Sequence, residues 1–518
     1  MKRITPHLWA TALSVSCAVT LFAGPVFAEE GAQGWQDSLN AFFGAYVVAP
    51  LVKVLFFDVA FWDNGSGDSV QIPFIVAWLV LGASFFTLRF SFVNIRAFGH
   101  ALAVTVGRYD RGEAEGEVSH FKALTSALSG TVGLGNIAGV AVAVHQGGPG
   151  AVFWMMVAAF LGMSSKFAEC TLGVMFRDVG DGGRVLGGPM SYLRKGLATL
   201  KLSRLGRVLA LVFAVMCLGG SLGGGNMFQA NQSYAQMQVL IPGLETTTGG
   251  WVYGVVIALL VGVVILGNIK RIGAVASFLT PIMCAIYLIA GVIIIVANAG
   301  ELARATGVIL GEAFTLRAGW GGLVGVLLVG FKRAAFSNEA GIGSAAIAYS
   351  AANTDEPVRE GIIALLEPFI DTIIVCTMTG LVVVVTGAYL EEGNGIVMTS
   401  RAFASVLPWF PKVLCLAVFL FAVSTMITWS YYGERCWVFL FGQRGSNVYK
   451  VIFLVFVVLG VQLNLENVIT FSDLMVLGMA LPNIIGVVLL SGTVRRALDD
   501  YWRRLKSGEM KPRTTSFF

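Results

Sequence analysis

Two glycine-rich clusters with polar side chains lie inside long apolar stretches of the sequence. One runs from Ser129 to Gly139 (SGTVGLGNIAG), and the other runs from Phe336 to Ser344 (FSNEAGIGS). Glycine destabilises a helix interior by about 1 kcal/mol relative to alanine, so each cluster predicts a helix that unwinds within a membrane. The freed N–H and C=O groups need polar partners. Carbonyls bind a cation and helix amino ends bind a carboxylate, so the expected chemistry is binding of an ion or a zwitterion.

Close packing of helices through small residues is the alternative explanation for such clusters. It does not account for Asn136, Asn338 and Glu339, which lie within the same clusters. Polar groups at membrane depth are usually functional, so binding is the favoured interpretation.

Other charged residues also fall inside apolar stretches. Asp371 costs roughly 2.5 kcal/mol or more to insert, and it could assist a cation site, relay a proton or brace the core. Lys332 and Arg333 are expected to pair with Glu339 or Glu367 beside an inner gate, because unpaired charges at depth are expensive.

The composition explains what surrounds these residues. Of the 518 residues, 56% are hydrophobic and 13% are charged, and the mean hydropathy is +0.78. A soluble domain carries roughly 25% charged residues, so the sequence predicts a membrane protein whose partner is the lipid bilayer. The net charge of +5 is too small to indicate nucleic-acid binding. The sequence contains no P-loop and no pairing of its four histidines, so no enzyme activity is expected.

The amino terminus predicts a secretory signal. Residues 1–28 combine Lys2 and Arg3, an apolar run and small residues before a cleavage point after Ala28. A retained first helix is the alternative. Residues 29–70 are expected to form a periplasmic or interfacial segment, because Pro50 and Lys53 break the apolar run there.

Apolar stretches of about 17 to 25 residues, long enough to cross a bilayer, predict an all-α protein with about eleven spans. They are Pro73 to Ile95, Leu124 to His145, Gly150 to Phe176, Val208 to Tyr234, Trp251 to Gly267, Ile272 to Ala297, Gly321 to Tyr349, Gly361 to Tyr389, Val413 to Phe441, Tyr449 to Leu465 and Ile469 to Leu490.

Basic residues alternate between loops. Segment 177–207 and the tail 493–518 are rich in lysine and arginine, whereas 236–250 contains neither. Because basic loops stay in the cytoplasm, the tail is expected inside and the start of the mature chain outside, in a bacterial inner membrane.

The two clusters resemble each other. Val132 to Ala138 superposes on Ala340 to Ala346 at a constant offset. Five spans separate their starting points, so the two copies enter the membrane from opposite sides, as in inverted repeats. The transporter domain is expected at 71–492, with repeats at about 121–297 and 318–491.

Several blocks of sequence resemble the alanine or glycine:cation symporter family, the sodium/alanine symporters of the amino acid-polyamine-cation superfamily. Residues 147–162 (GGPGAVFWMMVAAFLG) follow the family signature, with Met156 where tryptophan is usual. The signal-like start and the 58–68 insert depart from the family. The other matching blocks are 130–139, 225–231 (GNMFQAN), 332–341, 369–372 (FIDT), 424–425 and 430–435.

This resemblance implies a leucine-transporter-type fold of five plus five inverted repeats, preceded by one extra span. Its first and sixth core helices are the two stretches with glycine-rich clusters. It also implies sodium-coupled import of alanine or glycine, with Na⁺ as coupling ion and no other cofactor. A proton-coupled carrier, a carrier of another substrate such as glutamine, and an ion channel are the alternatives.

On this mapping, the amino acid is expected to contact both breaks and the third and eighth core helices. Asn226 and Gln229 could instead form interhelical hydrogen bonds, and Trp429 could be a packing residue. The expected substrate contacts are Thr131, Gly133, Gly135, Asn136, Asn226, Gln229, Ser337, Asn338, Gly341, Gly343 and Trp429.

Sodium is a hard cation that prefers oxygen ligands. The resemblance places a hydroxyl pair, Ser424 and Thr425, beside carbonyls near Val132 and Gly135, with Asp371 as a further ligand. A hydroxyl in a membrane helix can instead bond to its own backbone.

Overall fold

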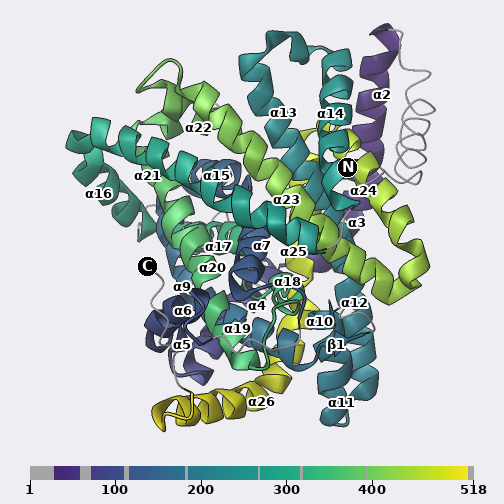
Figure 1. Cartoon of the computed structure of the whole chain (residues 1–518). Helices are drawn as coiled ribbons and strands as arrows, with labels where there is room; N and C mark the ends of the chain where they lie inside the picture. Colours follow the sequence, from purple (N-terminus) through teal and green to yellow (C-terminus); the bar gives the residue numbers. More distant parts are fainter. Residues whose placement is uncertain are drawn as a thin grey trace, which may run out of the picture.

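The structure is a computed structural model, and it describes residues 29–58, 72–109, 116–180, 185–266, 269–314, 319–391 and 395–510. The expected signal segment 1–28 and the end of the tail, 511–518, lie outside the described residues. Apart from one short hairpin, β1 (Asp178–Val179) with β2 (Val185–Leu186), the described chain is helical (Figure 1).

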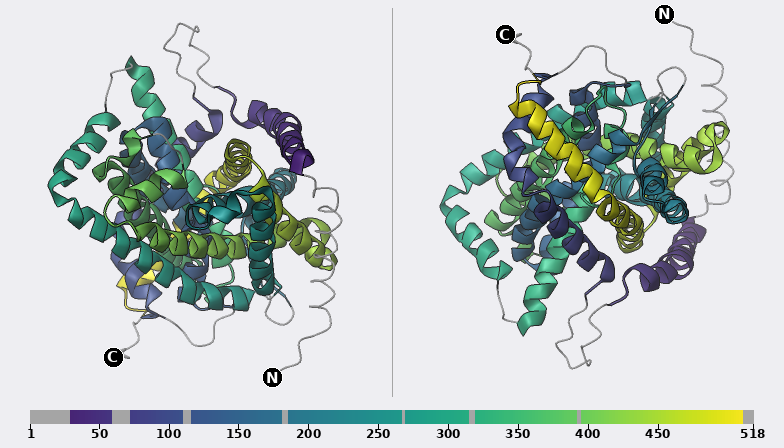
Figure 2. Two further views of the ribbon diagram at one scale, coloured as in Figure 1. Left: turned by 90° about the horizontal axis from the view of Figure 1, so that it is seen from above. Right: turned by 90° about the horizontal axis from the view of Figure 1, so that it is seen from below.

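The first described helix differs from the expectation. α2 (Glu29–Phe42), the π-helix η1 (Phe43–Val48) and α3 (Ala49–Leu55) follow one another directly, so Pro50 does not break the run. The wide π turn accommodates the missing N–H of the proline. Gln36–Leu55 is long and apolar enough to span a membrane. These helices lie at the edge of the bundle (Figure 2), and spanning or interfacial placement remains a prediction.

The next expected span is shorter than predicted. α4 (Phe74–Arg89) ends before a turn in which Ser91 and Phe92 have positive φ angles of 54° and 55°. Two short helices follow, α5 (Val93–Arg96) and α6 (Phe98–Thr105).

The first predicted break is confirmed. α7 (His120–Thr131) and the following helix, formed by η2 (Gly135–Gly139) and α8 (Val140–Gly147), meet at 52°. A Cβ at Gly133 would overlap the Thr425 hydroxyl, so glycine permits this close approach. The helices that follow are α9 (Gly150–Met175), α10 (Pro189–Ser191), η4 (Tyr192–Gly196), α11 (Leu197–Thr199), α12 (Ser203–Leu222), η5 (Gly223–Met227), α13 (Phe228–Leu240), η6 (Pro242–Glu245), α14 (Thr247–Ile265) and α15 (Ile269–Ala297).

The second predicted break is also confirmed. α17 (Gly319–Asn338) ends where Glu339, Gly341 and Gly343 take positive φ angles of 57°, 87° and 91°, and α18 (Ala345–Tyr349) continues beyond them. Before it come η7 (Ala299–Glu301) and α16 (Leu302–Ala313). After it come α19 (Pro357–Ala364), α20 (Leu366–Pro368), η8 (Phe369–Cys376), α21 (Thr377–Val385), η9 (Ala388–Leu390), α22 (Ile396–Ala404), α23 (Phe410–Phe441), η10 (Gln443–Gly445), α24 (Ser446–Gln462), α25 (Leu465–Gly478) and α26 (Ala480–Lys506).

Within the described residues, nine helices are long and apolar enough to cross a membrane, or ten if the bent pair at the first break counts as one span. The expectation of eleven differs in three places. Gln36–Leu55 is added, α4 is too short, and the stretch 321–349 is divided by its break. Each remaining expected span matches one of these helices.

The basic segments gather at one end of the molecule. In Figure 1, β1, α11 and the end of α26 lie at the lower end, whereas the α13–α14 connection and α22 lie at the upper end. Figure 2 shows α26 lying across the lower face. The described parts of the basic segments, 177–180, 185–207 and 493–510, therefore share a side opposite 236–250, as the alternation of basic loops predicts. Which side faces the cytoplasm remains a prediction.

Candidate functional site

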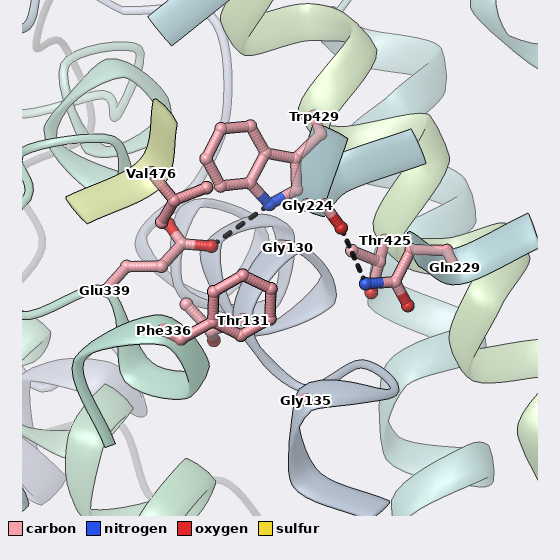
Figure 3. Close-up of a pocket in the computed structure, with 10 residues that line it drawn as sticks. All are labelled: Gly130, Thr131, Gly135, Gly224, Gln229, Phe336, Glu339, Thr425, Trp429 and Val476. Carbon is pink, nitrogen blue, oxygen red and sulfur yellow. Dashed lines mark hydrogen bonds between the residues drawn. The ribbon is translucent and has the colours of Figure 1, made fainter. Parts of the chain in front are cut away.

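A small cavity lies where the two breaks meet (Figure 3). Its free space is about that of one water molecule. Both breaks, the η5–α13 junction, α23 and α25 contribute to its walls. The lining residues are Gly130, Thr131, Gly135, Gly224, Gln229, Phe336, Glu339, Thr425, Trp429 and Val476.

The carboxylate of Glu339 is the charged group of this wall. Its Oε1 accepts a hydrogen bond of 3.0 Å from the Trp429 indole, and its Oε2 accepts one from the Ser344 hydroxyl. The left-handed backbone at Glu339 turns this side chain into the cavity (Figure 3). Glu339 was not among the expected substrate contacts. The signal that could have identified it is an acidic residue inside a glycine-rich break.

Lys332 and Arg333 do not pair with Glu339 or Glu367. Both contact Asp473 of α25, with Lys332 Nζ 2.8 Å from Asp473 Oδ2. The expectation failed because the break after Asn338 turns Glu339 away from the face that carries the two cations. Sequence reasoning had no means to identify Asp473, which lies on a distant helix.

Gln229 joins the first break to the η5–α13 junction. Its Oε1 accepts from the Leu134 N–H at 3.0 Å, and its Nε2 donates to the Gly224 carbonyl at 2.8 Å. Asn226 lies outside the cavity lining and donates to the Phe453 carbonyl of α24 at 2.6 Å. Gln229 thus lines the cavity and also links two segments by hydrogen bonds, whereas Asn226 only links η5 to α24.

Asp371 connects the two broken helices. Its Oδ1 accepts from Asn136 at 2.6 Å, and its Oδ2 accepts from Ser337 at 2.9 Å and from Thr372 at 2.6 Å. Asn136 Oδ1 also accepts from the Gly133 N–H at 2.8 Å, which holds the unwound turn. Asp371 is fully buried, and no ion pair to it is present within the described part of the chain. The carboxylate, a hydroxyl and an amide are thus gathered beside the cavity rather than in its wall.

The remaining polar and glycine positions of the second break face other helices. Asn338 donates to the Thr372 hydroxyl at 2.9 Å and accepts from the Ala340 N–H at 3.0 Å. A Cβ at Gly341 would meet Leu79 of α4 at 3.0 Å, and one at Gly343 would meet Asn483 of α26 at 2.9 Å. Direct contact of these residues with a substrate remains a prediction without support from their placement.

The two hydroxyls of the pair on α23, Ser424 and Thr425, have different contacts. Ser424 Oγ lies 2.6 Å from Ser129 Oγ, which also accepts from Thr428 at 2.9 Å. Thr425 Oγ1 lines the cavity and is buried without a hydrogen-bond partner in the described structure. A buried oxygen without a partner is costly, so Thr425 suits a ligand that the first break can share.

Clusters of three or more histidine, cysteine, aspartate or glutamate side chains suited to a metal do not occur among the described residues. Any cation here would therefore rely on carbonyl and hydroxyl oxygens with at most one or two carboxylates. Gly135 lines the cavity and Val132 does not. Sodium accepts such ligand sets, whereas transition metals prefer nitrogen and sulfur.

Comparisons with known proteins find similar sequences over most of the chain. The model of the sodium:alanine symporter family matches residues 61–516. The chain is 40% identical over 436 residues to the sodium/alanine symporter AgcS of Methanococcus maripaludis, covering 83% of this chain and 94% of AgcS. It is 30% identical over 448 residues to the probable sodium/glutamine symporter GlnT of Bacillus subtilis, covering 86% and 91%.

The crystal structure of MhsT in complex with L-phenylalanine is similar in fold. The TM-score is 0.52 at 15% identity, and the match covers 73% of this chain and 90% of that chain. The leucine-transporter-type fold that the family resemblance implies is confirmed by this similarity.

Proposed function

Because the chain belongs to the sodium:alanine symporter family, we propose that it couples sodium entry to import of a small neutral amino acid, alanine or glycine, by alternating access. It is an amino-acid/cation symporter rather than an enzyme. The observation that carries the choice of substrate is the small cavity between the two breaks. Its walls must move apart to admit even alanine, and a larger side chain would require a larger movement.

We infer an orientation of the amino acid from the groups that line the cavity. Glu339 supplies the negative charge that an ammonium group requires. The substrate carboxylate then points to the first break, where Gly135 and Thr131 bring main-chain groups close. Phe336 and Trp429 form the apolar walls that limit the side chain.

Two positions suit sodium. One lies between Thr425 and the first break, where the unpartnered hydroxyl needs a ligand. The other lies at Asp371, where Asn136 and Ser337 bring oxygen atoms from both broken helices. A cation at either position favours one arrangement of the breaks and thereby links its binding to that of the amino acid.

The energy available from sodium is sufficient. One ion moving inward across about 100 mV supplies about 2.3 kcal/mol, which supports accumulation of about 50-fold. We place the protein in a bacterial inner membrane with the basic tail in the cytoplasm, after removal of residues 1–28.

Uptake by the purified protein in liposomes tests this proposal. An inward sodium gradient should raise uptake of labelled alanine at least about tenfold over a potassium gradient of equal size. Unlabelled alanine and glycine should compete, whereas glutamine should compete weakly because of the cavity size. Uptake driven by a pH gradient and indifferent to sodium, or conductance without any amino acid, would contradict the proposal. If glutamine competed more strongly than alanine, glutamine would be the better assignment for the substrate.

A further inference from the structure

Four ionisable side chains are fully buried in and near the cavity wall. Lys166 and Glu169 lie one turn apart on α9, Glu367 lies on α20, and Glu339 follows α17. None of the four is more than 1% exposed. Three carboxylates therefore surround one lysine in a region without bulk water.

Each carboxylate except one has an assigned cation. Lys166 Nζ lies 2.9 Å from Glu367 Oε1. Under the proposed function, the substrate amino group neutralises Glu339, and one of the two sodium positions lies at Asp371. Glu169 is left over, because no ion pair joins it to Lys166 in the described structure.

The hydrogen bonds of Glu169 do not compensate for a full negative charge. Its Oε1 accepts from Asn483 Nδ2 at 2.7 Å, and its Oε2 is buried without a partner in the part of the chain that is described. The Gly341 backbone and the charge of Lys166 also act on this carboxylate, but Lys166 is within ion-pair distance of Glu367 and not of Glu169. An ionised carboxylate that shares its nearest cation with another acid is disfavoured in the interior.

We infer that Glu169 is a proton-binding site of the transport cycle, and that the carrier works with this carboxyl protonated. The inference rests on the proposed function, because the charge count assigns sodium and the amino group to Asp371 and Glu339. The ligand is a proton rather than a metal, since the described residues form no carboxylate cluster suited to a metal.

Titratable groups from several packed elements lie in the region of Glu169. Lys166 is the only cation among them, and it is already paired. The others are neutral or acidic: Cys170 on α9, Tyr192 on η4, Glu339 after α17, Tyr349 on α18, Glu360 on α19, Glu367 on α20 and Tyr432 on α23.

Asn483 links this proton to the second break. The same Nδ2 that donates to Glu169 also donates to the Gly341 carbonyl at 2.9 Å, and Tyr192 holds Asn483 Oδ1. Ionisation of Glu169 would strengthen the hydrogen bond that it accepts from Asn483 and would attract Lys166 away from Glu367. Both changes disturb the contacts that hold α17 and α18 against α9, so loss of the proton should slow transport.

The pH profile of sodium-driven uptake tests the inference. Between about pH 6 and about pH 9, uptake by the wild type should fall, approaching about tenfold per pH unit once Glu169 is mostly ionised. Glu169→Gln copies the protonated carboxyl and should remove the fall. Glu367→Gln frees Lys166 for Glu169 and should weaken the fall too, so this variant decides the matter if Glu169→Gln does not fold. Glu434→Gln, a matched change at a residue paired with Lys450, should keep the wild-type profile.

A second measurement needs no substrate. A proton bound only by the folded protein stabilises it, so the unfolding temperature of the full chain in detergent should fall as pH rises, and less so in Glu169→Gln. This result can stand even if alanine uptake is not driven by sodium. Parallel pH profiles of uptake and of unfolding temperature in the wild type and Glu169→Gln would overturn the inference.

Discussion

The carboxylate of Glu339 gives the cavity its polarity. It is the charged side chain of the lining, and it is held by Trp429 and Ser344 rather than by a cation. Under the proposed function, a zwitterion entering the cavity has one favourable direction, with its amino group toward the second break.

Glu339→Gln should weaken alanine transport through its apparent affinity. The substitution keeps the shape and removes a charge-assisted hydrogen bond worth about 1.5 to 3 kcal/mol, so the KM for alanine should rise by about 10- to 100-fold. Initial uptake rates at saturating sodium measure it. Glu434→Gln serves as the matched control with an unchanged KM. An unaltered KM in Glu339→Gln would place the amino group elsewhere.

The hydroxyls of the α23 pair should differ in importance. Thr425 is unpartnered in the described structure, whereas Ser424 is bonded to Ser129. Thr425→Val keeps the volume and removes the oxygen, so the sodium concentration for half-maximal uptake should rise about tenfold or more. Ser424→Ala should have a smaller effect. Equal effects of the two changes, or none from Thr425→Val, would remove Thr425 from the cation site.

At the scale of the elements, close approach of helices shapes the cavity wall. Gly225 in η5 faces the Trp429 ring so closely that a Cβ would overlap it. η5 can therefore approach α23 this closely only because Gly225 has no side chain. Trp429 in turn is fixed between η5 and Glu339, so the helix packing and the charge of the cavity depend on each other.

Gly225→Ala should displace Trp429 and disturb the cavity. Overpacking of this kind costs about 1 to 3 kcal/mol, so the unfolding temperature should fall and the KM for alanine should rise. Gly307→Ala, on α16, provides the control: an added Cβ meets no neighbouring element there, so the KM should stay unchanged and the unfolding temperature should not fall, since alanine favours the helix. A variant Gly225→Ala with wild-type stability and affinity would show that the wall yields to the added methyl group.

The elements that local sequence specifies were predicted well. Glycine clusters and polar residues located both breaks, because the cost of glycine in a helix is a local property. The partners of Lys332 and of Glu169 were not predictable, since Asp473 and Asn483 reach them from helices far along the chain. The continuity of the helix through Pro50 was missed because a π turn compensates for the proline. The inward direction of Glu339 depends on one left-handed residue that no pattern specified.

At the scale of the whole molecule, two similar breaks meet around one cavity, and Asp371 binds side chains from both. Through these contacts, a movement of one broken helix can change the position of the other. Coupled transport requires that sodium and the amino acid each bind better to one arrangement of these halves. The buried ion pair of Lys166 with Glu367, outside the cavity lining, joins α9 to α20.

Equilibrium binding of labelled alanine to the purified protein, measured with increasing sodium at constant ionic strength, tests this account most directly. The affinity for alanine should increase at least about tenfold from potassium to saturating sodium, and alanine should raise the affinity for sodium by the same factor. Alanine binding of equal strength with and without sodium would contradict the account, because the breaks would then bind their two ligands independently.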